Sequence, residues 1–185
     1  MAIAGLSGSS VEYYARLSAE KETIKNQAAN LESAAKKVED SIDAFSPNGM
    51  FTNLYITNKN SSAFRDFSAN ALRGLVKSYN ELNEVSASSD RLSDEGKALL
   101  DKAKALFAGP NAELFREMGL EMNAATGTMT FDENRFADRL AADPYEVKRL
   151  LCDRNSLGSV LQQVIEDIAA RSTQGYFNSS FIINA

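Results

Sequence analysis

A seven-residue repeat of apolar positions organises the first quarter of the chain. Positions spaced alternately three and four apart form one stripe over residues 14–45, made up of Tyr14, Leu17, Lys21, Ile24, Ala28, Leu31, Ala35, Val38, Ile42 and Phe45. This is the pattern of a coiled-coil seam, and it predicts a long amphipathic helix over residues 11–46. Serines just before residue 11 can cap the start of the helix, and the Ser46-Pro47 pair ends it.

The two edges of this seam differ in size. One edge carries only large apolar residues, whereas the other includes the small Ala28 and Ala35 and the charged Lys21. A helix with such a stripe gains most of its stability from a partner surface. The partner is either the rest of the same chain, folded as a bundle, or a coil in another molecule, and the sequence leaves both open.

Apolar residues at helical spacing predict a mainly helical domain over residues 47–175. Helices are expected at residues 62–85, from Ser93 to about residue 107, after Asn111, and over residues 157–168 with an end at Gly175. Asp132 and Asp143 stand where helix caps are expected. Residues 50–56 mix apolar and turn-favouring types and predict a short strand or an extended connector.

A change of period marks one β element. Leu120 and Met122 precede the turn-like residues 124–127, and Met129 and Phe131 follow it in alternation. This pattern predicts a small β-hairpin. The expected fold class is therefore mainly α, with a long amino-terminal coiled-coil helix packed on or extending a helical bundle and one small β-hairpin.

The chain divides into four predicted segments. These are a mobile segment at residues 1–10, the coiled-coil helix at 11–46, the helical domain at 47–175 and a docking tail at 176–185. The tail contains the apolar residues Phe181, Ile182 and Ile183, whose exposure to water is unfavourable. We therefore expect the tail to dock on a surface. Residues 1–10 are small and polar, with too little apolar surface to offset the entropy of ordering.

Composition and charge narrow the expected partners. The formal net charge is −5, and no basic cluster is present, which argues against a nucleic-acid partner. No apolar run reaches the length needed to cross a bilayer, and the first residues lack a secretory signal. We therefore expect a protein that has no membrane partner and that is soluble or is exported by a route without a cleaved signal.

The usual catalytic groups are scarce. The sequence contains no histidine and one cysteine, Cys152, so the commonest neutral-pH base and a thiolate zinc cluster are both missing. Adjacent acidic pairs such as Glu166 and Asp167 diverge on a helix. We expect no enzymatic activity, no cofactor and no metal. Cys152 ends an apolar helical run and is expected to be a buried or half-buried filler.

Three stretches of the chain resemble a known family. They are residues 118–136 around Gly127-Thr128-Met129-Thr130-Phe131-Asp132-Glu133, residues 140–151 around Asp143-Pro144 and Val147, and the helix containing Val76-Lys77-Ser78-Tyr79-Asn80-Glu81-Leu82. In order and spacing they are similar to the carboxy-terminal conserved region of the bacterial flagellar filament cap family, hook-associated protein 2. The similarity spans residues 64–168. The chain departs from the family in lacking large variable domains and a long coil after Ile168.

The resemblance implies a structural role. A member of this family would be a ring-forming subunit at the distal end of the flagellum, exported without a cleaved signal, with flagellin or hook-associated proteins as partners. The residues expected to mediate self-association are the large seam positions and the tail, namely Tyr14, Leu17, Ile24, Leu31, Val38, Ile42, Phe45, Phe181, Ile182 and Ile183.

Two other functions fit the same sequence features. The first is a cytosolic coiled-coil adaptor or secretion chaperone that binds a partner helix in the groove left by Ala28 and Ala35. The second is a tip protein of a phage or secretion system that shares the helical domain.

Overall fold

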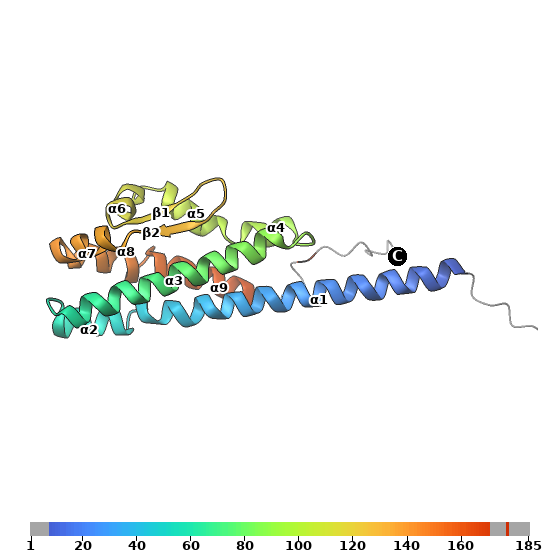
Figure 1. Ribbon diagram of the computed structural model, residues 1–185, viewed down its shortest axis with the longest axis horizontal. Helices are drawn as coiled ribbons and strands as arrows, with labels where there is room; N and C mark the ends of the chain where they lie inside the picture. Colours follow the sequence, from blue (N-terminus) through green and yellow to red (C-terminus); the bar gives the residue numbers. More distant parts are fainter. Residues whose placement is uncertain (1–7, 171–176, 178–185) are drawn as a thin grey trace, which may run out of the picture.

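The computed structural model describes residues 8–170 and 177 and is mainly helical, as predicted. Figure 1 shows a long helical hairpin with shorter elements packed along one side of it. In chain order the elements are α1 (Gly8–Ile42), the short 3-10 helix η1 (Asp43–Phe45), α2 (Met50–Asn58), α3 (Ser62–Ser88), α4 (Asp94–Ala98), α5 (Asp101–Ala108), α6 (Ala112–Glu117), β1 (Leu120–Met122), β2 (Met129–Phe131), α7 (Glu133–Ala142), α8 (Pro144–Cys152) and α9 (Leu157–Ala170).

The two longest helices, α1 and α3, run antiparallel and pack along much of their length (Figure 1). The apolar stripe of α3 is fully buried at Leu72, Leu75, Tyr79 and Leu82. Along the edge of this contact Lys37 of α1 donates to Glu81 of α3 at 2.7 Å. That hydrogen bond lowers the pKa of the Glu81 carboxyl. Because the pair is solvent-exposed, its contribution to stability is small beside that of the apolar stripe.

Helix α9 packs against α1, and α5, α8 and the hairpin lie on the same side of the long helices (Figure 1). Gly158 in the first turn of α9 marks a close approach between the backbones of neighbouring elements. A Cβ at this position would lie 2.7 Å from the carbonyl oxygen of Leu151 and 3.5 Å from Cβ of Phe45. The absence of a side chain at Gly158 therefore lets α8, α9 and η1 meet.

Residues 50–58 form helix α2, so the predicted strand or extended connector at residues 50–56 is wrong. The helix places Phe51 between two other rings, with centroids 5.7 Å from Phe45 and 5.1 Å from Phe64. Each of these rings is at most 1% exposed. The segment is too short for its apolar spacing to distinguish a helix from a strand, and the contacts that decide come from residues distant in the sequence.

The predicted β-hairpin is confirmed, with Leu120 opposite Phe131 and Met122 opposite Met129. Asn80 of α3 holds it in place. Its side-chain amide donates to the carbonyl oxygen of Met129 at 2.8 Å, and its side-chain oxygen accepts from the Met129 amide at 2.8 Å. The Asn80 side chain thus pairs with strand β2 as a neighbouring strand would.

Both predicted aspartate caps are confirmed. Asp132 accepts hydrogen bonds from the first amides of α7, and Asp143 accepts from the Glu146 amide at 3.0 Å. The helix predicted from Ser93 to residue 107 is divided in two. The amide of Leu99 donates to Gly96 over three residues, which tightens the backbone between α4 and α5.

Buried apolar residues from Ala28 to Phe177 form one cluster. The carboxyl-terminal part of α1 is therefore part of the same core as the rest of the domain, and the predicted boundary at residue 46 separates two elements rather than two cores. Residues 1–7 of the predicted mobile segment and all of the predicted tail except Phe177 lie outside the described residues.

Candidate functional site

The predicted seam of α1 divides into a buried part and an exposed part. Its carboxyl-terminal positions lie in the core of the chain, where Leu31, Val38, Ile42 and Phe45 are at most 3% exposed. Their partners are therefore intrachain, and this corrects their assignment to a self-association edge. Ile24 is half-buried and packs against the same core.

The groove expected at the small seam positions is closed. Ala28 and Ala35 are 3% and 4% exposed, because the small side chains let neighbouring elements of the same chain pack against α1. No partner helix can enter there without unfolding the core. The groove that the adaptor or chaperone alternative required for its partner helix is therefore not present on the surface.

The amino-terminal end of α1 is different, because apolar side chains there face solvent. Val11 is 59% exposed, Tyr13 is 45% exposed and Tyr14 is 63% exposed, while Leu17 is half-buried. We call these four residues the amino-terminal stripe. The rings of Tyr13 and Tyr14 meet edge to face with centroids 5.6 Å apart.

The amino-terminal stripe continues the face that is buried further along α1. Leu17 lies seven residues before Ile24 and fourteen before Leu31, and Tyr13 lies four before Leu17. Residues at these spacings share one side of a helix. The face that packs inside the chain from Ile24 onward is thus the face that is exposed before it.

Polar contacts mark the place where α1 leaves the folded domain. Glu20 lies 3.5 Å from the guanidinium of Arg91, and the side-chain amide of Gln27 donates to Asp90 at 2.9 Å. Arg91 and Asp90 follow the end of α3. Figure 1 shows α1 continuing well past α3 and α9, so this first part of α1 projects from the domain.

Charges of both signs flank the amino-terminal stripe. Glu12, Arg16, Lys21 and Glu22 are all exposed on the same part of α1, and Glu22 lies 3.9 Å from Lys25. An apolar stripe with mixed charges beside it is the arrangement of a coiled-coil surface, where flanking charges set partner choice and orientation. The surface is therefore suited to a helical or extended apolar partner.

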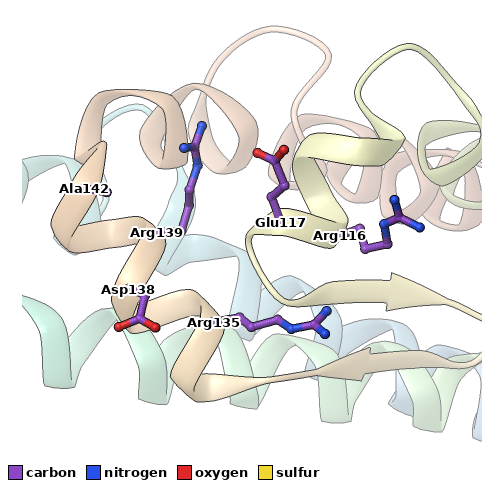
Figure 2. A pocket seen from close by; sticks show the side chains of 6 residues that line it. All are labelled: Arg116, Glu117, Arg135, Asp138, Arg139 and Ala142. Atoms are coloured by element: carbon purple, nitrogen blue, oxygen red, sulfur yellow. The ribbon is translucent and has the colours of Figure 1, made fainter.

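A pocket of about 540 Å³ lies between α6 and α7, and its six lining residues are shown in Figure 2. The guanidinium of Arg139 and the carboxylate of Glu117 extend toward the same side of the pocket. Arg116 donates to Glu113 at 2.5 Å, and Arg135 donates to Glu121 at 3.2 Å. Arg139 lies 4.0 Å from the carboxylate of Asp143, and its buried Nε has no hydrogen-bond partner. Because two of the three guanidinium groups are engaged by carboxylates and the third faces Asp143, we assign no ligand to this pocket.

Cys152 lines a second pocket, of about 570 Å³, between η1 and the start of α9. Its side chain is 6% exposed, which confirms the predicted filler role. Burial raises the pKa of the thiol to about 12, although a hydrogen bond with Thr52 and the charge of Lys148 act in the opposite direction. The thiolate, which is the reactive form, is therefore scarce at neutral pH.

We expect Cys152 to resist thiol reagents in the folded protein. At pH 8 an aromatic disulfide reagent should react at the rate of local opening, and addition of denaturant should bring the reaction to the rate of a free thiol. Absorbance of the released thiolate measures both rates, and Cys152→Ser supplies the blank. Rapid stoichiometric reaction in native buffer would contradict the burial.

Comparison of the chain with protein-family models, with curated proteins and with solved structures finds no significant match. Among residues 8–170 and 177, no group of three or more cysteine and acidic side chains is placed to hold a metal ion. None of the helices in this described part of the chain is both long and apolar enough to span a bilayer.

Of the residues predicted for self-association, the structure leaves Tyr14 and Leu17 available on the surface. Phe181, Ile182 and Ile183 lie outside the described residues. Sequence reasoning missed Tyr13 and Val11, which a repeat anchored on residue 14 does not include. The spacing of four between Tyr13 and Leu17 is the signal that could have identified Tyr13.

Proposed function

We propose that this chain is a structural, self-associating protein of the bacterial flagellum, of the class that caps the growing filament. The amino-terminal stripe is the surface through which copies meet one another or meet flagellin or hook-associated partners. The observation that carries the proposal is the exposure of Val11, Tyr13 and Tyr14 on a helix that projects from the domain.

Burial energetics support an assembly role for this stripe. Covering a large apolar side chain contributes about 1.5–3 kcal/mol relative to leaving it exposed. Leu17 and Tyr14 on two copies would together supply several such contributions if the helices paired. The coil pattern and its flanking charges fit a second helix.

The flagellar assignment itself is supported by the sequence resemblance over residues 64–168. The elements that carry this resemblance are α3 and the run from the end of α6 to α8. The run includes the hairpin between Leu120 and Phe131 and the capped helix starts at Asp132 and Asp143. Export from the cell and a place at the filament tip follow from the same proposal.

Self-association is tested by light scattering on the purified chain over a wide range of concentration. The proposal predicts a mass-average molar mass that rises with concentration above that of the 20.2 kDa subunit. A mass that stays at one subunit up to submillimolar concentration would contradict it.

The flagellar role is tested separately, in a strain that lacks this chain. Loss of motility, restored by the wild-type chain, and recovery of the chain from the medium are the expected results. Retention of the chain inside the cell together with normal motility of the deletion strain would contradict the role. This result would leave the association measurement unaffected.

A further inference from the structure

Phe177, beyond the end of α9, lies beside Leu92. Phe177 forms an isolated antiparallel bridge with Leu92, and the two side chains are 8% and 1% exposed. Leu92 follows Arg91, whose guanidinium lies 3.5 Å from the carboxylate of Glu20 on α1. Phe177 is therefore anchored near the point where α1 leaves the domain.

The amino-terminal stripe begins close to this anchor. At a rise of about 1.5 Å per residue, Leu17 lies about 5 Å along α1 from Glu20, and Val11 lies about 14 Å from it. An extended chain covers about 3.3 Å per residue, so residue 181 can lie up to about 13 Å from Phe177 and residue 183 up to about 20 Å. These lengths let residues 181–183 reach the Leu17 end of the stripe, which is the part nearest the anchor.

The chemistry of the tail matches the stripe. Residues 178–183 read Asn-Ser-Ser-Phe-Ile-Ile, with two small hydroxyl residues before three apolar ones and no charged side chain. Such a segment can lie on Tyr14 and Leu17 without removing a charge from water. Covering exposed apolar surface on both partners is favourable, at about 25 cal/mol per Å².

We propose that Phe181, Ile182 and Ile183 dock on the amino-terminal stripe of their own chain. The own chain is the favoured occupant because the anchor at Phe177 keeps these residues within reach, and a short tether gives millimolar effective concentration. A second copy at micromolar concentration competes poorly with such a tether.

This docking makes the tail a competitor of self-association. A copy that binds the stripe must first displace residues 181–183, so the tail lowers the affinity between copies and keeps the free subunit apart from its neighbours. This consequence rests on the proposed function, whereas the docking itself does not.

Engineered cysteine pairs test the docking. In a chain with Cys152→Ala, Leu17→Cys is combined in turn with Phe181→Cys, Ile182→Cys and Ile183→Cys, and intrachain disulfides are measured by mass spectrometry at low micromolar concentration. Ala19→Cys with the same tail variants is the control. Ala19 is exposed on α1 two residues from Leu17, which places it on the opposite face of the helix at a similar distance from the anchor.

At least one Leu17 pair should close about tenfold faster than its control, because docking holds the two thiols together. Closure of the whole panel at the rate of the controls would overturn the proposal. Disulfides formed only between chains would also overturn it, since the occupant would then be the tail of another copy.

Light scattering on Ile182→Asp separates the two proposals. Release of the tail should strengthen association several-fold. Intrachain disulfides in a chain that stays monomeric with Ile182→Asp would support the docking and contradict self-association. Self-association that is unchanged by Ile182→Asp, with disulfides at the control rate, would contradict only the docking.

Discussion

Replacement of Phe64 by alanine is expected to lower the free energy of unfolding by about 3–5 kcal/mol, the range for a buried aromatic ring. Phe64 is fully buried and contacts Phe51 and Tyr55, with ring centroids 5.1 and 6.4 Å away. The variant leaves a cavity where α2 and α3 meet. Because domains of this size are stable by only about 5–15 kcal/mol, the loss should be large.

Chemical denaturation followed by circular dichroism measures this loss. Phe67→Ala is the matched control, because Phe67 lies one turn along the same helix but is only half-buried. Phe67→Ala should lower the free energy of unfolding by clearly less than Phe64→Ala does. Equal losses in the two variants, or a Phe64→Ala loss below about 1 kcal/mol, would contradict the packing described for this ring cluster.

The second large effect is expected on association. Leu17→Asp removes one large apolar side chain from the amino-terminal stripe and adds a charge. Burial of a leucine is worth about 1.5–3 kcal/mol, and each 1.4 kcal/mol is tenfold in affinity, so association should weaken by roughly tenfold to a hundredfold or more. Stability should change little, because Leu17 does not belong to the buried core.

Sedimentation equilibrium measures the association constant, and thermal unfolding checks the fold. Ile56→Asp is the control for adding a charge to an exposed apolar position. Ile56 belongs to α2, which lies at the opposite end of the molecule from the start of α1 (Figure 1). Unchanged association in Leu17→Asp would refute the stripe as the interface. Comparable weakening in the Ile56→Asp control would do the same.

Much of the fold could be predicted because the sequence signals are local. The three- and four-residue spacing of apolar side chains predicts the long first helix and α3, and the side chains of Asp132 and Asp143 cap helices where their positions indicate. The alternation around Gly127 predicts the hairpin. Gly127 itself has a φ of +71°, a conformation that glycine adopts easily.

The remaining features depend on contacts between distant residues. Residues 50–58 are helical because Phe51 packs between Phe45 and Phe64, and no local spacing specifies that contact. The seam of α1 repeats without a break, so its pattern alone does not reveal where the intrachain partner ends. That point is set by the end of α3, near Arg91, which pairs with Glu20.

Amide hydrogen exchange along α1, measured from micromolar to submillimolar concentration, tests the central claim most directly. The claim is that one face of α1 packs within the chain from Ile24 onward and between chains before it. Protection of amides in residues 11–20 should rise with concentration, while that of residues 31–42 stays constant and high. Protection of residues 11–20 that is the same at every concentration would contradict the claim.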